Sequence, residues 1–390
     1  MQFIDLAAQQ SGIRHKLEQR IKAVLDHGNY IMGPEVGELE EKLAAFSGAR
    51  HCIACSSGTD ALLMALMAWE IGPGDAVFVP AYTFFATAEV VALLGATPVM
   101  VDIDPVTYNM NPRDLEKAIA AVAARDASLY PLPRPALSHA LTPRAVVAVD
   151  LFGQAADYAA LLPLAKRHGL LVLEDAAQSF GARQDGRRAC ALGCDMAATS
   201  FFPAKALGCY GDGGAVFTDD DARADELRSI RVHGKGGSKY DNVRIGLTAR
   251  LDTIQAAVLL CKLEIFEDEL AARHTVAGWY ADRLADLPGV VTPAVAAGNT
   301  SIWSQYCIRI PNGRRDATAA ALKERGIPTN IYYPKPLTLL EAFKPLGYKA
   351  DDMPESLKAS REALALPFHP YMAKADVDRV TTAIKESTYG

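Results

Sequence analysis

Short runs of consecutive apolar residues alternate with helix-length segments over about the first 220 residues of the chain. The expected strands lie at His51–Cys55, Ala76–Val79, Pro98–Val101, Ala145–Val149 and Leu170–Leu173. Strands that are apolar at consecutive positions are buried on both faces, and helices between them are typical of parallel pairing. The pattern therefore predicts an α/β domain built on a mostly parallel sheet.

The pattern changes after about residue 262. Leu263, Phe266 and Leu270 have the spacing of an amphipathic helix, which we expect over residues 264–285. A strand at Tyr306–Ile310 and a helix at Ala317–Arg325 follow. We therefore expect a large domain of residues 1–262 with a sheet, and a smaller C-terminal α/β domain of residues 263–390.

One stretch interrupts the alternation. Residues 121–143 contain four prolines and little periodicity, so we expect an exposed loop there. The loop is an insertion whose composition does not indicate a role.

Composition narrows the class of protein. The chain has 390 residues with 50% hydrophobic content, enough for a large core, and its net charge is −6. Nucleic-acid binding needs a basic face, so we expect no nucleic-acid partner. No run approaches the roughly 20 apolar residues that cross a bilayer, and Met1–Asp5 lacks the pattern of a signal peptide. We expect a cytoplasmic protein with no membrane partner.

The seven cysteines are scattered and odd in number, which argues against a disulfide framework. Cys52-x-x-Cys55 and Cys190-x3-Cys194 have spacings that zinc sites use, but the flanking residues favour buried thiols beside strands. We expect no metal site.

Polar residues follow the expected strands at their carboxyl ends, where open α/β sheets bind ligands. Ser56-Ser57-Gly58-Thr59-Asp60 stands between a strand and a helix expected at Ala61–Trp69. A helix start of this kind favours an anion such as phosphate. The alternative is an ordinary N-cap.

Glu174-Asp175 ends another apolar strand. An acid at this place is costly to bury unless it meets a cation or hydrogen-bond donors. For a lone Asp175, a structural ion pair or a helix cap is the alternative.

Lys205 lies in the run Ser200-Phe201-Phe202-Pro203-Ala204-Lys205-Ala206-Leu207. A free lysine has a pKa of about 10.4, and desolvation by Phe201, Phe202 and Leu207 would lower it toward roughly 7, which makes the amine nucleophilic. The alternative is a surface lysine whose stem lies on apolar groups. The glycine-rich residues 208–214 indicate a phosphate cradle or a tight turn into a strand at Ala215–Thr218.

Together these features match one cofactor. Pyridoxal phosphate (PLP) needs a phosphate cradle, an acid for its pyridinium nitrogen and a lysine in apolar surroundings. Phe84, at a further strand end, would supply a stacking face.

The motifs that carry this chemistry resemble those of a known family. They are Gly33-Pro34-Glu35, Ser57-Gly58-Thr59-Asp60-Ala61-Leu62, Thr83-Phe84-x-Ala86-Thr87-Ala88, Glu174-Asp175-Ala176-Ala177-Gln178-Ser179, Ser200-Phe201-Phe202-Pro203-x-Lys205 and Arg250-Leu251-Asp252-x-x-Gln255-Ala256-Ala257. The chain resembles the DegT/DnrJ/StrS nucleotide-sugar aminotransferases, which have the aspartate-aminotransferase fold (PLP fold type I). Within the family it is most similar to members that aminate UDP-2-acetamido-2-deoxy-3-oxo-glucuronate.

The resemblance implies a role for each matched residue. Lys205 is the catalytic lysine that bonds to PLP and moves protons, and Asp175 pairs with the pyridinium nitrogen. Gln178 lies beside the phenolic oxygen and Phe84 stacks on the ring. The implied phosphate contacts are Gly58, Thr59, Asp60 and Ser200. Related dehydratases carry histidine at the position of Lys205, so the lysine favours transamination.

The family's active sites are shared across a homodimer, and here the chain departs from the pattern. The family usually has Asn where this chain has Thr248, which the partner subunit brings to the cofactor phosphate. Arg250 is a candidate contact for a carboxylate of glutamate or of a uronate sugar, or else forms a structural ion pair with an acid such as Asp252. Further substrate-side candidates are His233, Tyr240, Tyr332 and His369.

The expected function is PLP-dependent transfer of an amino group from glutamate to a keto-sugar nucleotide, a UDP-3-oxo-N-acetyl-hexuronate, in the synthesis of surface polysaccharide such as lipopolysaccharide. One alternative is a dTDP-linked 3-keto or 4-keto hexose as acceptor. Another is a PLP-binding regulator without turnover.

Overall fold

A seven-stranded sheet forms the centre of the molecule in a computed structural model that describes residues 1–238 and 240–389. Its strands, in spatial order, are β1 (His51–Cys55), β9 (Gly214–Thr218), β8 (Met196–Ser200), β5 (Leu171–Asp175), β4 (Thr142–Val149), β2 (Asp75–Pro80) and β3 (Thr97–Val101). Only β9 runs antiparallel to its neighbours, so the mostly parallel α/β sheet is confirmed.

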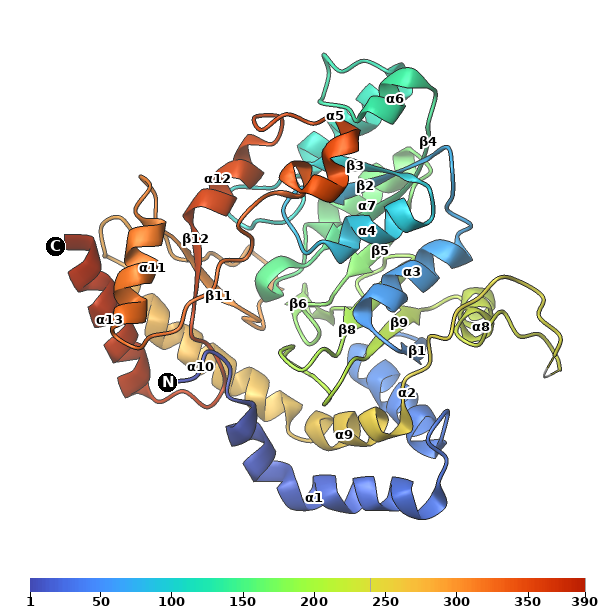
Figure 1. Ribbon diagram of the computed structural model, residues 1–390, viewed down its shortest axis with the longest axis horizontal. Coiled ribbons are helices and arrows are strands. Elements are labelled where there is room, and N and C mark those ends of the chain that lie inside the picture. The colour runs from blue at the N-terminus through green and yellow to red at the C-terminus, as the bar shows by residue number, and fades with distance from the viewer. Residues whose placement is uncertain (239, 390) are drawn as a thin grey trace.

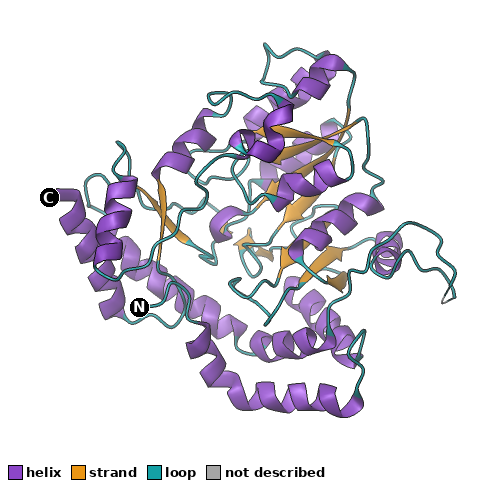
Figure 2. Ribbon diagram, viewed as in Figure 1, coloured by secondary structure: helices purple, strands orange, loops and turns teal. Residues whose placement is uncertain are grey.

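Helices cover both faces of this sheet (Figures 1 and 2). They are α1 (Leu6–His27), α2 (Pro34–Ser47), α3 (Gly58–Ala68), α4 (Ala86–Leu93), α5 (Pro112–Ala124), α7 (Tyr158–Arg167), α8 (Asp221–Ile230) and α9 (Thr253–Leu263). Alternate residues of β1 and β9 enter different cores. Ile53 and Val216 pack with α3 and α8, whereas Ala54 and Phe217 pack with α2 and α9. Burial on both faces explains why these strands are apolar throughout.

The C-terminal part has an apolar cluster of its own around Tyr280, Tyr306 and Leu364. Its elements are α10 (Phe266–Leu284), β11 (Tyr306–Arg309), α11 (Arg315–Glu324), α12 (Pro354–Glu362), β12 (Ala363–Leu366) and α13 (Lys374–Tyr389). Short elements complete the description: α6 (Arg134–Ser138), β6 (Arg183–Gln184), β7 (Arg187–Arg188), β10 (Asn299–Thr300), and the 3-10 turns Leu151–Gly153, Leu337–Leu339 and Glu341–Leu346. The division after residue 262 stays a prediction, because Leu337, Phe343 and Met353 join the core of the large sheet.

The expected exposed loop over residues 121–143 is wrong in part. Helix α5 continues to Ala124, the short helix α6 follows, and β4 begins at Thr142. Tyr130, Leu132 and Ala136 are buried. The prolines do not exclude a helix here, because Pro135 lies in the first turn of α6, where a helix tolerates proline.

This insertion protects the outer edge of the sheet. At the edge strand β3 the backbone N–H of Met100 donates to the Tyr348 hydroxyl (3.0 Å), and that of Asp102 donates to the Tyr130 hydroxyl (2.8 Å). Pro98 on the same strand has no N–H to satisfy. Tyrosine hydroxyls from two distant segments thus satisfy donors that would otherwise invite pairing with another strand.

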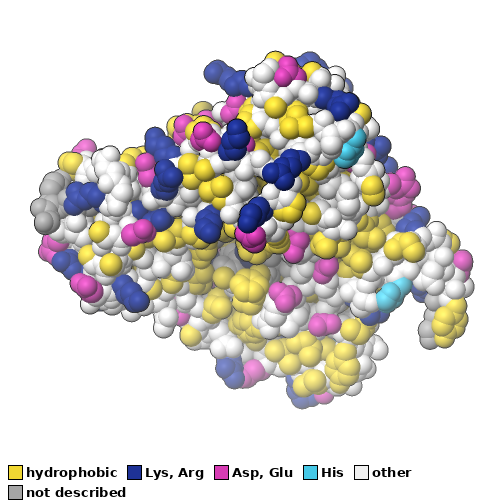
Figure 3. All heavy atoms as spheres, turned by 45° about the horizontal axis from the view of Figure 1, so that its top comes forward, with side chains coloured by type: hydrophobic (Ala, Val, Ile, Leu, Met, Phe, Trp, Pro, Cys, Tyr) yellow, Lys and Arg dark blue, Asp and Glu magenta, His cyan; other side chains and the backbone are white. Residues whose placement is uncertain are grey.

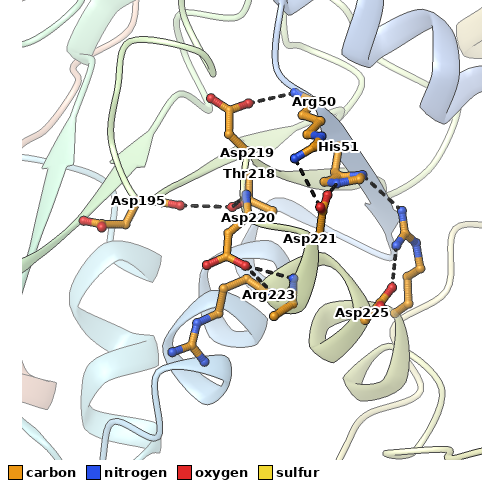
Figure 4. A network of polar contacts seen from close by, with 11 residues as sticks. Arg50, His51, Asp195, Thr218, Asp219, Asp220, Asp221, Arg223 and Asp225 are labelled. Carbon is orange, nitrogen blue, oxygen red and sulfur yellow. Dashed lines mark hydrogen bonds and ion pairs between the residues drawn. The ribbon is translucent and has the colours of Figure 1, made fainter.

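A network of polar contacts joins the start of β1 to the residues that follow β9 (Figure 4). The backbone N–H of Arg50 donates to Asp219 (2.8 Å), and His51 contacts Asp221 (2.7 Å). Asp220 caps α8 by accepting from two backbone amides. The network lies at the amino end of β1, a strand length away from Ser56 and Ser57, so it stabilises the sheet rather than the ligand-binding edge.

Two further expectations can be compared with the fold. The seven cysteines are free thiols, and all but the half-buried Cys194 are buried, as the flanking residues indicated. In the described ranges, no helix combines the length and apolar character that crossing a bilayer requires.

The edge arrangement predicts a loss of stability when the hydroxyls are removed. Tyr130→Phe or Tyr348→Phe leaves a buried N–H without its acceptor, so each should lower the free energy of unfolding by about 1–2 kcal/mol. Urea denaturation measures this, with Tyr30→Phe, an exposed tyrosine, as the control. Unchanged midpoints for both edge variants would show that the hydroxyls do not satisfy the edge.

Candidate active site

The polar residues predicted at strand ends converge on one edge of the sheet. Asp175 ends β5, Ser200 ends the neighbouring β8, and Ser57 follows β1. Because β9 lies between β8 and β1, Gly214 at its start brings Ser200 and Ser57 together. The structure thus groups three motifs that are far apart in the sequence.

An anion cradle lies at the start of α3. Ser57 caps this helix by accepting from the backbone N–H of Asp60 (3.0 Å), as the alternative interpretation expected. The Asp60 carboxylate turns back and accepts from the hydroxyls of Ser56 (2.6 Å) and Ser57 (2.8 Å). Among the described residues, none accepts from the backbone N–H groups of Gly58 and Thr59, which leaves them for an anion.

Close packing shapes this cradle. A Cβ on Gly58 would lie 2.5 Å from the Cβ of Ser200, and one on Gly214 would lie 2.4 Å from the carbonyl oxygen of Ser57. Neither position has room for a side chain. The two glycines therefore hold the Ser200 side chain against the start of α3, where its hydroxyl adds to the donors for an anion.

Asp175 is buried and held by hydrogen bonds. Its Oδ2 accepts from the Thr87 hydroxyl (2.9 Å) and its Oδ1 from the backbone N–H of Ala177 (3.2 Å). Burial raises the pKa of Asp175, while these hydrogen bonds and the charge of Lys205 oppose that shift. A carboxylate in these surroundings favours a cationic partner, such as a protonated pyridine nitrogen.

Lys205 lies in a turn, where its backbone N–H donates to the carbonyl oxygen of Phe202 (2.8 Å), and its charge acts on Asp175. Phe201 and Leu207 are buried beside the turn, but Phe202 is 52% exposed, so it does not contribute to desolvation as expected. Burial lowers the pKa of Lys205, and the negative charge of Asp175 opposes the shift. Lys205 is half-buried rather than exposed, which favours the interpretation as an active amine over that of a surface lysine.

Gln178 and Phe84 meet at Tyr333, a residue that the sequence analysis did not single out. Gln178 donates to the Tyr333 hydroxyl (3.1 Å) and accepts from the backbone N–H of Phe152 (2.9 Å). The Phe84 ring, 58% exposed, lies 6.3 Å from that of Tyr333. The available sequence signal is its neighbour Tyr332, a predicted substrate-side residue directly before it. The Tyr332 backbone carbonyl, rather than its ring, accepts from Tyr82 (2.5 Å).

Thr87 is a second residue whose role the sequence analysis missed. It lies in the first turn of α4 and is buried, and its place in the motif Thr83-Phe84-x-Ala86-Thr87-Ala88 was the available signal. Thr83 contacts its hydroxyl (3.2 Å), which orients the hydrogen bond to Asp175.

The remaining candidates lie in two places. Thr248 and His233 are exposed and joined by a hydrogen bond of 2.7 Å, and Ala249 accepts from the backbone N–H of Ser56 (3.2 Å). Tyr240, which is 85% exposed, lies on the same extended loop, which comprises residues 232–238 and 240–248. His369 is buried against Tyr371 instead, where burial and the charge of Arg273 lower its pKa.

Arg250 follows Thr248 and is half-buried. Its Nε is buried with no hydrogen-bond partner, and no ion pair to Asp252 or any other acid forms within the described ranges. The structural ion pair considered from the sequence is therefore not formed, and the guanidinium remains available for an anion.

This arrangement fits PLP: a cradle of backbone amides and hydroxyls for phosphate, a buried carboxylate for a ring nitrogen, and an amine of lowered pKa. On the visible face, Lys and Arg side chains are interspersed with acidic ones (Figure 3). An anionic ligand would thus be held by these few placed groups.

Comparison with known proteins agrees with the geometry. The chain matches the DegT/DnrJ/EryC1/StrS aminotransferase family over residues 12–385 and belongs to it. It is 46% identical over 386 residues to the UDP-2-acetamido-2-deoxy-3-oxo-D-glucuronate aminotransferase of Pseudomonas aeruginosa, covering 98% of this chain and 99% of the relative. It is 38% identical over 384 residues to a dTDP-3-amino-3,4,6-trideoxy-alpha-D-glucose transaminase of Streptomyces venezuelae, covering 98% and 95%.

Solved structures agree as well. A DegT/DnrJ/EryC1/StrS aminotransferase from Brucella abortus is 50% identical with a TM-score of 0.92, covering 99% of each chain. The ntda protein of Bacillus subtilis, solved with bound cofactor PMP, is 26% identical with a TM-score of 0.85, covering 100% of this chain and 83% of that one. The expected fold type I class, the aminotransferase activity and the PLP cofactor are confirmed.

The contact between Thr87 and Asp175 predicts a specific defect. Thr87→Val keeps the shape but removes the hydrogen bond that lowers the pKa of Asp175, so less of the carboxylate is available for a cation. We expect the Kd for PLP to rise about tenfold, or ~1.4 kcal/mol, by fluorescence titration. Thr83→Val, which removes only the contact to Thr87, is the control and should change the Kd less. Equal effects would contradict a direct role.

Proposed function

We propose that this chain transfers an amino group from glutamate to the 3-oxo group of a UDP-linked N-acetyl-hexuronate. The observation that carries the proposal is the half-buried Lys205, which lies close enough to the buried Asp175 for their charges to interact, at the sheet edge that holds Ser200 and the anion cradle. The relative from Pseudomonas aeruginosa, similar over almost the full chain, supports the choice of sugar.

Each residue of the site has a proposed task. Bound PLP would supply two things: an aldehyde that condenses with an amine, and a ring that withdraws electrons. Asp175 holds a proton on the ring nitrogen, and Gln178 orients the phenolic oxygen. The phosphate contacts are the backbone amides of Gly58 and Thr59 and the hydroxyl of Ser200. Asp60 acts by orienting Ser56 and Ser57, since its own carboxylate would repel phosphate.

Lys205 is the proposed base that moves protons between carbon atoms of donor and acceptor. A lysine with an ordinary pKa is almost wholly protonated at neutral pH and cannot accept a proton. Desolvation by the buried Phe201 and Leu207 increases the fraction of Lys205 that is neutral. The turn that begins at Phe202 holds the backbone of Lys205 in place.

Arg250 is the proposed contact for a carboxylate. Its guanidinium forms no ion pair with a described residue, and a guanidinium binds a carboxylate in bidentate fashion. A uronate sugar and glutamate both carry that group, and the test below separates them. Tyr333 and Phe84 form the aromatic side of the site and are proposed to contact the cofactor ring.

The oligomer and location belong to this proposal too. The extended loop of residues 232–238 and 240–248 projects from the body of the molecule beside α8 (Figure 1) and exposes the apolar Val243 (57%) and Ile245 (86%). Such residues favour burial against a second copy of the chain, which would bring Thr248 and His233 to the partner's cradle. A homodimer with shared sites, in the cytoplasm, in the synthesis of surface polysaccharide, is the proposed setting.

The second candidate acceptor is a dTDP-linked 3-keto or 4-keto hexose, favoured by the 38% identity to the transaminase of Streptomyces venezuelae. A product assay with glutamate against UDP- and dTDP-keto sugars tests both. Conversion of UDP-3-oxo-hexuronate at the highest kcat/KM is expected, and preference for a dTDP-hexose would replace the proposal. A chain that binds PLP but converts none of them with glutamate would be a regulator.

Removing the lysine should abolish the chemistry. For Lys205→Ala we expect no detectable transamination and, after borohydride reduction, no PLP-labelled peptide by mass spectrometry. Lys166→Ala, an exposed lysine on α7, is the control and should retain both. A labelled peptide in the Lys205 variant would place the reactive amine elsewhere.

Replacing Arg250 separates its two candidate ligands. Arg250→Met should lower kcat/KM for the uronate substrate by about 10- to 100-fold, or ~1.4–2.7 kcal/mol, through loss of a charged hydrogen bond. The rate of the glutamate half-reaction, followed by absorbance, should change little. Arg50→Met, at the far end of β1, is the control. A loss confined to glutamate would assign Arg250 to the donor.

A further inference from the structure

Two fully buried carboxyl groups lie directly behind the cofactor site. Glu174 is on β5 and Asp150 follows β4, and both are 0% exposed. The strands are neighbours, paired at Val149 and Asp175. Because side chains alternate along a strand, Glu174 points to the opposite face of the sheet from Asp175. The proposed function assigns this pair no task.

Asp150 has the contacts of an ionised carboxylate. Its Oδ1 accepts from the hydroxyl of Tyr158 (2.8 Å) and the backbone N–H of Ala156 (2.9 Å). Its Oδ2 accepts from the hydroxyl of Ser179 (2.7 Å). Three donors directed at one carboxyl group favour its charged form.

Glu174 has the contacts of a neutral acid. Its Oε1 accepts from the backbone N–H of Cys190 (2.8 Å), but Oε2 is buried and receives no hydrogen bond from a described residue. Ala148 of β4 is paired with Glu174, so Asp150, two residues beyond Ala148, lies on the same face of the sheet as Glu174, and each of the two carboxyl groups shifts the pKa of the other. Two neighbouring carboxyl groups in a fully buried site cannot both be ionised, so one of them carries a proton.

We propose that Glu174 is a protonated carboxylic acid that donates its hydrogen bond to Asp150, and that this pair positions Asp175 and Gln178 in the active site. The positioning role rests on the proposed function, whereas the shared proton does not. Both residues are positioning residues, because neither is among the groups proposed to contact the cofactor or a substrate.

The route from the pair to the site is short. The backbone N–H of Asp150 donates to the carbonyl of Asp175 (3.1 Å). The Asp150 carboxylate accepts from the hydroxyl of Ser179, which lies in the turn that follows Asp175. Two residues beyond Asp150, the backbone N–H of Phe152 donates to Gln178 (2.9 Å). Displacing Asp150 would therefore move the backbone of Asp175 and the amide of Gln178 together.

The charges around the pair agree with this assignment. Burial raises the pKa of Asp150 to about 6, and burial together with the charge of Asp150 raises the pKa of Glu174 well above its ordinary value. The titratable neighbours acting on the pair are Asp175, Tyr158, Cys190 and Cys194, which are acidic or neutral. Because Asp150 already accepts from three donors and Glu174 from one, the proton is assigned to Glu174.

The competing arrangement is an ionised, hydrated Glu174. A cavity of about 10 Å³, lined in part by Glu174, Cys190 and Cys194, has room for about one water molecule. The experiment has to separate this from a shared proton.

Infrared spectroscopy of the full cofactor-loaded chain at pH 7.5 tests the proton itself. The spectrum of the unaltered chain minus that of Glu174→Gln should contain the carbonyl band of a protonated carboxylic acid. Absence of this band would overturn the assignment and indicate an ionised Glu174. The measurement does not depend on turnover, so it stands even if no sugar substrate is converted.

Matched variants test the positioning role. Glu174→Ala should lower kcat at least tenfold and shift the pH midpoint of the bound cofactor's absorbance, while KM for glutamate stays within about twofold. Glu174→Gln should restore both values, because its amide still donates to Asp150 and accepts from Cys190. Asp150→Asn should show the same defects as Glu174→Ala. The asparagine side chain places an NH2 donor where the donors that contact Asp150 need an acceptor.

The reverse result, a silent Asp150→Asn with a damaging Glu174→Gln, would overturn the assignment of the proton. If Glu174→Ala and Asp150→Asn change only the melting temperature and leave the absorbance midpoint and kcat unchanged, the pair is structural and the positioning role is wrong. Ser179→Ala keeps the pair but removes its tie to the turn, so it provides the same readout should Asp150→Asn not fold.

Discussion

The burial of the Asp175 carboxylate is the constraint on which the rest of the site depends. An acid at the end of an apolar strand is stable only if donors and cations surround it. Thr87 and Ala177 supply the donors, and Lys205 is the nearby amine whose own pKa falls through the same burial. One desolvated edge of the sheet therefore prepares both an acid for a cation and an amine for condensation.

The sheet makes this arrangement possible because it brings distant motifs to one edge. Strand β9 reverses direction between β8 and β1, and Gly214 at its start lets Ser200 approach the first turn of α3. A cradle for phosphate arises from backbone amides that the helix leaves unpaired. No large basic field is needed, in keeping with a net charge of −6.

The parts of the chain outside the site serve its rigidity and its reach. The insertion that contains Tyr130 and the C-terminal segment that contains Tyr348 together satisfy the edge strand β3. The extended loop that carries Thr248 and His233 projects beside α8 instead, and the contact with the start of the anion cradle is made by Ala249, whose carbonyl accepts from the backbone N–H of Ser56.

The sequence alone determined the sheet, because strands buried on both faces must be apolar at consecutive positions. It marked Lys205 and Asp175 as candidates, because their motifs together with the phosphate motif match the contacts that PLP needs. It also marked Ser57 and Gly58 through their place between a strand and a helix. Tertiary structure decided what depends on contacts between distant residues. Tyr333 reaches Gln178 across 155 positions, Thr87 reaches Asp175 across 88, and His369 packs with Tyr371 away from the site. The burial of the loop at Tyr130 was also decided by tertiary structure. Prolines restrict only the local backbone, so they do not indicate which distant strand a side chain of the loop covers.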